Sequence, residues 1–146
     1  VEEHFGTFTQ GSDGNIIVIG RDQEITLRAA EAAVAAMRRS GGVMLPFPGG
    51  IVRSGSKVGS KYKMLKASTN HEFCPTLRAH PQSLMPEDGM CAYEILACGP
   101  DIGDIGRAMA AGARAAALPG IVKITCGNYG GKLGKVHFPL RELINA

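Results

Sequence analysis

The sequence has 146 residues, of which 45% are hydrophobic and 20% are charged, and its formal net charge is +3. This length and composition are typical of one globular domain and exclude an intrinsically disordered chain. The chain has no run of about eighteen apolar residues, which excludes an ordinary membrane-spanning helix.

The first predicted unit is a strand, a helix and a second strand. Residues 15–20 form an apolar run that predicts the first strand, and Asp22 is the expected N-cap of the helix. Two glycines at 41 and 42 end the helix, and residues 43–45 predict the next strand. The apolar positions at helical spacing are Leu27, Ala30, Val34 and Met37.

A second unit repeats this order. Residues 90–98 predict a strand, and Asp101 or Asp104 opens the following helix. Pro119 and Gly120 break that helix, and residues 121–125 predict a final strand. The helical positions expected to pack are Ile105, Met109, Gly112 and Ala116.

Two such units predict a single α+β domain over residues 1–146. The order β-α-β-β-α-β is that of the ferredoxin-like sandwich, with a four-stranded antiparallel sheet and both helices on one face. The alternative, a doubly wound parallel sheet, would require a third helix, which the pattern does not predict. Residues 49–86 form an insertion between the halves, which we expect to be ordered. Its apolar anchors are Ile51, Val52, Tyr62, Met64, Leu65 and Phe73. Residues 126–134 form a second insertion.

The four cysteines form no C-x-x-C pair, so we expect no metal site. Cys91 and Cys98 point to opposite faces of one predicted strand and cannot pair. We expect all four thiols to be reduced and mostly buried, which indicates a cytoplasmic protein. The N-terminus, Val1-Glu2-Glu3-His4, lacks the layout of a signal peptide and an initiator methionine, so we expect a trimmed or truncated chain, or one from which only the methionine was removed.

The positive charge is concentrated in one part of the chain. No acidic residue lies between Glu31 and Glu72, while seven basic residues do. Such a region either attracts anions or is a solvated basic surface. Its basic residues are Arg38, Arg39, Arg53, Lys57, Lys61, Lys63 and Lys66.

Residues 46–63 (PFPGGIVRSGSKVGSKYK) combine glycines, serines and lysines. Glycines allow close approach of the backbone to a ligand, and the serines and lysines supply donors for phosphate or carboxylate groups. The run lacks the Walker A pattern. A basic, glycine-rich hairpin without a ligand is the alternative interpretation.

This run resembles the formylmethanofuran:tetrahydromethanopterin formyltransferase family. So do residues 65–70 (LKASTN), 73–77 (FCPTL) and 127–134 (GNYGGKLG). The resemblance extends from about Phe5 to Ile144 and covers only the C-terminal lobe, so we expect an N-terminal lobe outside this chain.

The resemblance implies formyl transfer between formylmethanofuran and N5 of tetrahydromethanopterin, without a metal or prosthetic group. It also implies two related ferredoxin-like lobes, binding of anionic coenzymes at lobe and subunit boundaries, and assembly into homo-oligomers or a larger formyltransferase/hydrolase complex. The residues expected to bind substrate are Arg53, Ser54, Ser56, Lys57, Ser60, Lys61, Tyr62, Lys63, Ser68, Asn70, Asn128 and Tyr129.

Glu94 is the expected catalytic residue. Formyl transfer passes through a tetrahedral oxyanion and requires a group that moves a proton. Glu94 lies in mid-strand, on the same face as Ala92, Leu96 and Cys98, where apolar neighbours would raise the pKa of its carboxyl. The alternative is a structural glutamate, at an exposed edge or in a buried ion pair.

The remaining residue types decide less. Tyr129 either stacks on a substrate ring or packs over its own turn, and His71 is the histidine closest to the binding motifs. Aromatic residues are 5% of the chain and tryptophan is absent, which argues against a nucleic-acid-binding module. A non-catalytic assembly or small-molecule-binding subunit of a formyltransferase/hydrolase complex is the second hypothesis.

Overall fold

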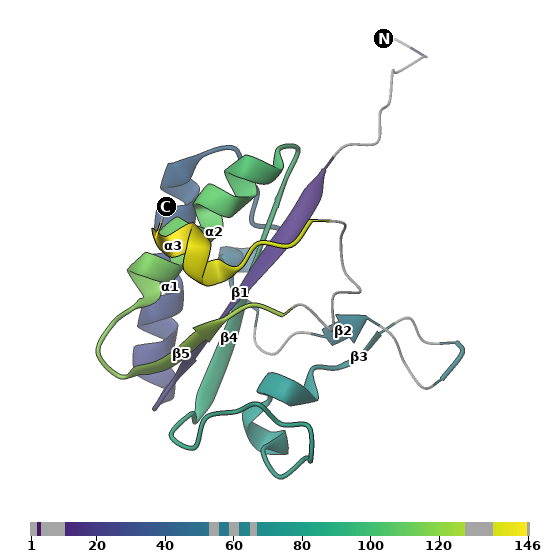
Figure 1. The fold of residues 1–146 in the computed structure, drawn as a ribbon, viewed down its shortest axis with the longest axis vertical. Helices are drawn as coiled ribbons and strands as arrows, with labels where there is room; N and C mark the ends of the chain where they lie inside the picture. Colours follow the sequence, from purple (N-terminus) through teal and green to yellow (C-terminus); the bar gives the residue numbers. More distant parts are fainter. Residues whose placement is uncertain are drawn as a thin grey trace.

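The computed structural model describes residues 3, 11–52, 56–58, 62–64, 67–127 and 136–145. They form an α+β domain in which helices pack on an antiparallel sheet (Figure 1). The elements in chain order are β1 (Ser12–Gly20), α1 (Gln23–Ser40), β2 (Ser56–Val58), β3 (Ala67–Thr69), β4 (Cys91–Gly99), α2 (Ile102–Ala116), β5 (Ile121–Thr125) and α3 (Leu140–Asn145). Short 3-10 turns lie at Pro48–Gly50, His71–Phe73 and Pro75–Leu77.

The main sheet has the order β4-β1-β5 within the described residues, and both pairings are antiparallel. The β1–β4 ladder is continuous, from Ser12 opposite Gly99 to Gly20 opposite Cys91. Strands β2 and β3 form a separate two-stranded hairpin. The predicted strands at residues 15–20, 90–98 and 121–125 are therefore confirmed, with boundary shifts at the first two.

The predicted strand at residues 43–45 is wrong. Among the described residues, the outer edge of β4 carries two isolated bridges, Met44 with Cys98 and Val52 with Glu94. Between them the chain contains Pro46 and Pro48, which have no N–H to donate to a ladder. A turn at Pro48–Gly50 then carries the chain away from β4 and back.

Both helices begin as the sequence predicts. The Asp22 carboxylate accepts a hydrogen bond of 2.9 Å from the Ile25 N–H and is the N-cap of α1. Of the two aspartates expected for α2, Asp101 is the N-cap, accepting from the Asp104 N–H at 2.9 Å. Helix α1 ends at Ser40, and its C-cap Gly41 has a φ of 71°, a conformation that favours glycine.

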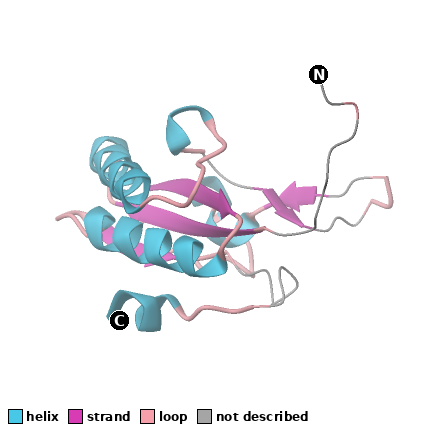
Figure 2. Cartoon of the chain, turned by 90° about the horizontal axis from the view of Figure 1, so that it is seen from above, coloured by secondary structure: helices cyan, strands magenta, loops and turns pink. Residues whose placement is uncertain are grey.

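The main core lies between the two long helices and one face of the sheet (Figures 1 and 2). The strands contribute Ile16, Val18, Tyr93 and Ile95 to this face. The helices contribute mainly alanines and two methionines, Met37 of α1 and Met109 of α2. Small side chains allow the helices to pack closely: a Cβ on Gly112 would lie 2.5 Å from the Met37 Cε.

A second, smaller apolar cluster covers the opposite face of the sheet. Phe73 packs there with Ile17, Ile19 and Ala92. The Arg78 guanidinium holds the segment that leads to β4, because it donates to the Glu87 carbonyl at 3.2 Å and to the Gly89 carbonyl at 2.5 Å.

Only some of the expected insertion anchors are buried. Phe73 is buried, and Ile51 and Val52 are half-buried. Tyr62 and Met64 are 54% and 88% exposed, so the prediction that they anchor the insertion is wrong. Both lie in a turn between the strands of the β2–β3 hairpin. Leu65 lies outside the described residues.

The short helix α3 lies against α2 (Figure 2). Arg114 of α2 donates to the Ile144 carbonyl through Nε at 3.1 Å and Nη2 at 2.5 Å. No helix of the described part of the chain has the length and apolar character needed to cross a membrane.

Candidate functional site

Glu94 lies in the middle of β4, opposite Ile17 of β1. Its side chain is on the sheet face that carries Ala92 and Phe73, away from the two long helices. Its backbone N–H donates to the Val52 carbonyl and its carbonyl accepts from the Val52 N–H, both at 2.8 Å. The residue is 8% exposed, which excludes the exposed-edge alternative considered from the sequence.

The carboxylate of Glu94 has a neutral partner. The Asn15 amide donates from Nδ2 to Glu94 Oε1 at 2.5 Å. In turn, Asn15 Oδ1 accepts a hydrogen bond from the Gly127 N–H at 2.9 Å. The described residues contain no cation within ion-pairing distance of this carboxylate, so they do not support the buried ion pair that the sequence left open.

Burial raises the pKa of the Glu94 carboxyl above its ordinary value, and the hydrogen bond from Asn15 lowers it in part. The expected direction is therefore confirmed. A glutamate of this kind holds a proton closer to neutral pH than an exposed one, which is the property required of a group that both accepts and returns a proton. The catalytic role itself stays a prediction.

Lys123 brings a positive charge to the same face. It pairs with Ile19 across the β1–β5 ladder, and its ammonium lies 5.3 Å from the centre of the Phe73 ring. The Lys123 Nζ also donates to the Leu84 carbonyl at 3.3 Å. This contact fastens the segment around Phe73 to β5.

Asn70, an expected binding residue, is 3% exposed, and its Oδ1 has no hydrogen-bond partner among the described residues. A buried acceptor of this kind is costly unless a donor reaches it. It lies between β3 and the turn that carries Phe73. The neighbouring His71 ring contacts His80, with a centroid distance of 4.3 Å.

The structure places the other expected binding residues unevenly. Tyr62 and Lys63 are exposed in the turn of the β2–β3 hairpin. Lys57 of β2 lies opposite Ser68 of β3, and Ser56 lies opposite Thr69, but only their backbone is described. The residues that lie outside the described part of the chain are Arg53, Ser54, Ser60, Lys61, Asn128 and Tyr129.

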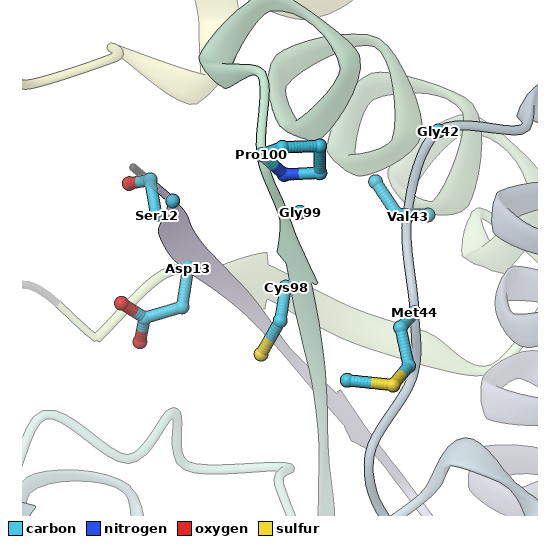
Figure 3. A pocket seen from close by; sticks show the side chains of 9 residues that line it. Ser12, Asp13, Gly42, Val43, Met44, Cys98, Gly99 and Pro100 are labelled. Atoms are coloured by element: carbon cyan, nitrogen blue, oxygen red, sulfur yellow. The ribbon is translucent and has the colours of Figure 1, made fainter. Parts of the chain in front are cut away.

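An open recess of about 810 Å³ lies at the end of β4, beyond Glu94 (Figure 3). Its lining includes Asp13, Met44 and Cys98, and Glu94 does not contribute to it. Burial, and then the nearby Asp13 carboxylate, raise the pKa of the Cys98 thiol. The recess therefore has no activated nucleophile at its cysteine.

All four cysteines are free, as expected. The expectation that they are mostly buried agrees with the structure, in which Cys74 is buried and the other three are half-buried. Burial raises the pKa of the Cys126 thiol to about 11, so this thiol is also unreactive near neutral pH. The described residues contain no group of three or more histidine, cysteine, aspartate or glutamate side chains that could hold a metal ion.

The sequence interpretation missed Asn15. It counted this residue as the start of an apolar strand, although asparagine is depleted in strands. The available signal was period two: Asn15, Ile17 and Ile19 share the face on which Glu94 lies. A polar residue on the face of an expected catalytic carboxyl is a possible partner for it.

Comparison with known proteins gives a family match along nearly the whole chain. A family model described as "FTR, proximal lobe" matches residues 1–143. A formylmethanofuran–tetrahydromethanopterin formyltransferase from Methylococcus capsulatus is 47% identical over 147 residues, which cover 98% of this chain and 49% of the relative. The enzyme of that name from Methanococcoides burtonii is 49% identical over 146 residues, with the same coverage. The chain thus spans about half the length of these relatives.

Two solved structures are similar in fold and sequence. A formyltransferase of the same name from Methanosarcina barkeri superposes with a TM-score of 0.81 and 48% identity, over 88% of this chain and 44% of that one. A formyltransferase/hydrolase complex from Methylorubrum extorquens with methylofuran gives a TM-score of 0.83 and 44% identity. The match covers 90% of this chain and 44% of the matched chain.

Proposed function

This chain belongs to the FTR formyltransferase family, because the family model of the proximal lobe matches residues 1–143. We propose that the chain is the C-terminal lobe of a formyltransferase. The enzyme transfers a formyl group between formylmethanofuran and N5 of tetrahydromethanopterin. The observation that carries the proposal is the buried Glu94 carboxyl, held by an amide and shifted toward neutral pKa. The similarity of the chain to enzymes named for this reaction supports the assignment.

In the proposed mechanism Glu94 moves one proton twice. As N5 of the pterin attacks the formyl carbon, a C–N bond forms, the carbonyl electron pair moves to oxygen, and the carboxylate accepts the N5 proton. The oxyanion then restores the carbonyl, the original C–N bond breaks, and the carboxyl returns its proton to the leaving amine. A raised pKa suits both steps, because the group has to exchange a proton near the working pH.

The polar residues of the motifs that resemble the formyltransferase family are proposed to bind the anionic coenzymes. Support comes from the acid-free, basic stretch of sequence and from the buried Asn70 Oδ1, which has no partner in the described part of the chain and would accept a hydrogen bond from substrate. The proposed binding set is Arg53, Ser54, Ser56, Lys57, Ser60, Lys61, Tyr62, Lys63, Ser68, Asn70, Asn128 and Tyr129.

We propose the ferredoxin-like arrangement for residues 1–146. The strand order β5-β1-β4, followed by Met44 and Val52 on the outer edge of β4, supports it. In this proposal the fourth strand is reduced to two bridges. The N-terminal lobe of the relatives would supply the rest of the enzyme.

We also propose that the enzyme needs no resident metal or prosthetic group and acts in the cytoplasm, without nucleic-acid or membrane partners. It would assemble as a homo-oligomer or as part of a formyltransferase/hydrolase complex, as the similarity to such a complex supports. The second candidate function is a non-catalytic subunit of such a complex, which the similarity to the formyltransferase/hydrolase complex also supports.

Glu94→Gln tests the catalytic proposal in the intact protein that contains this chain. It keeps the size of the side chain and removes the ionisable proton, so kcat for formyl transfer should fall by roughly 10²- to 10⁴-fold. Glu31→Gln, at an exposed position of α1, is the matched control and should leave kcat unchanged. A Glu94→Gln enzyme within a few-fold of normal kcat would refute the role of Glu94. An intact protein without formyl transfer would support the non-catalytic subunit instead.

The binding proposal has a separate test. Affinity for the coenzymes should fall as salt rises, because exposed charges are screened over about 8 Å at physiological ionic strength. Lys57→Ala combined with Lys61→Ala should lower the affinity and its salt dependence, measured by calorimetry. Arg141→Ala, on the exposed surface of α3, should change neither. Salt-independent affinity would contradict the proposal.

A further inference from the structure

Asn15 links three parts of the chain through one amide. Its backbone lies in β1, its Nδ2 donates to Glu94 of β4, and its Oδ1 accepts from Gly127, two residues beyond the end of β5. The Gly127 N–H can only donate, so it fixes which end of the amide is oxygen. The remaining end, Nδ2, must then face the carboxylate.

The strands do not need this side chain in order to pair. The β1–β4 ladder runs without interruption on both sides of Asn15, from Ser12 to Gly20. Asparagine is also a poor strand residue, and here it precedes four apolar residues, Ile16 to Ile19. Both amide bonds are thus additional to those that build the sheet.

We propose that Asn15 is the positioning residue for the Glu94 carboxyl: it holds Oε1 and leaves Oε2 to exchange the proton. This inference rests on the catalytic role proposed for Glu94. Among the described residues, Asn15 is the donor to that carboxylate. Because Gly127 anchors Asn15 Oδ1 in turn, the direction of the donor is fixed on two sides.

The amide also sets the protonation of Glu94. Burial favours the neutral carboxyl, whereas the Nδ2 donor favours the ionised one. Loss of the donor would raise the pKa of Glu94 further. The carboxylate would then be the minor form at a pH where the native enzyme still has it, and proton acceptance would require more alkaline conditions.

Two substitutions separate the donor from the anchor. Asn15→Ala removes both bonds. Asn15→Asp keeps an acceptor for the Gly127 N–H but replaces the donor with a second carboxylate, which raises the pKa of its neighbour more strongly. The alkaline shift in the pH profile of kcat should therefore increase from the native enzyme to Asn15→Ala to Asn15→Asp. At the native optimum, kcat should fall by about 10- to 100-fold through misplacement, with KM changed far less.

The experiment measures kcat and KM against pH in the intact protein, with Asn15→Ala also combined with Glu94→Gln. If Asn15 acts through Glu94, the double variant is no slower than Glu94→Gln alone. Asn145→Ala, at the exposed end of α3, is the control for loss of an amide. Unchanged pH profiles, or an equal further loss in the double variant, would overturn the inference.

Failure of the proposed function gives a different result. If Glu94→Gln keeps its kcat, the catalytic proposal fails whatever Asn15 does. The Glu94 carboxyl can then still be titrated by NMR in the native protein and in Asn15→Ala. A higher pKa in the variant would support the contact with Asn15, and an equal pKa would overturn it.

Discussion

The two faces of the sheet differ in how completely they are apolar. On the helix face, Ile16, Val18 and Ile95 are fully buried, and alanines from α1 and α2 pack above them. On the opposite face, a small cluster around Phe73 covers Ile17 and Ile19, and the polar pair Asn15 and Glu94 lies farther along the same strands. Adjacent residues of one strand therefore have different environments.

If Glu94 has the proposed catalytic role, this difference separates stability from chemistry at the scale of single residues. The helix face is buried by large, continuous elements, so a residue there contributes mainly to the free energy of folding. The opposite face carries a buried carboxyl with a raised pKa, an arrangement that is unfavourable for folding and useful for proton transfer. Substitutions on the helix face should therefore lower the stability more than kcat, and substitutions at the polar pair on the opposite face should lower kcat more than the stability.

The largest expected effect on stability is at Ile95. Ile95→Ala leaves a cavity under the two long helices and should lower the free energy of unfolding by about 2–5 kcal/mol, measured by urea denaturation. Leu96→Ala, one residue along β4 and half-buried on the other face, should cost clearly less. Equal losses at the two positions would contradict the difference between the faces.

The next effect is on the pH dependence of stability. The pKa of Glu94 is higher in the folded than in the unfolded protein, so its contribution is fully present below the unfolded value, near 4.5. That contribution is lost as pH rises through the folded value. Relative to the native protein, Glu94→Gln should therefore become more stable as pH increases from about 4 to 8. A stability difference that is constant with pH would show that the carboxyl is not shifted.

The smallest effect concerns the N-terminus of α1. Asp22→Ala removes the acceptor for the Ile25 N–H and should lower the free energy of unfolding by about 1 kcal/mol. Thermal denaturation would measure this loss, and kcat should remain at the native value. A fall in kcat larger than the stability loss explains would indicate that the helix face also takes part in the chemistry.

The sequence predicted most of the regular elements because their signals are local. Asp22 and Asp101 cap their helices through residues three positions away, and apolar runs mark β1, β4 and β5. The prediction of a strand at residues 43–45 was wrong because the prolines that follow have no N–H groups to donate to the edge of β4. Residues 43–45 themselves have the apolar character of a strand.

The site was predicted in part for the same reason. A lone carboxylate in an apolar strand is visible in the sequence, and Glu94 was identified from it. Its partner Asn15 lies 79 positions away, and only the β1–β4 register brings the two together. The sequence also did not predict the exposure of Tyr62 and Met64, because residue type alone does not distinguish an apolar residue in a turn from one in a core.

The attachment of α3 has a consequence for local unfolding. A helix of six residues is too short to be stable in water, so α3 depends on its contacts with α2. The Arg114 guanidinium holds the last carbonyls of α3, and Leu143 lies over Gly106, where a Cβ would approach it to 3.3 Å. Detachment of α3 would leave the sheet and its two long helices intact. Its amide protons should therefore exchange with solvent well before those of β1, and a protease should reach the chain there first.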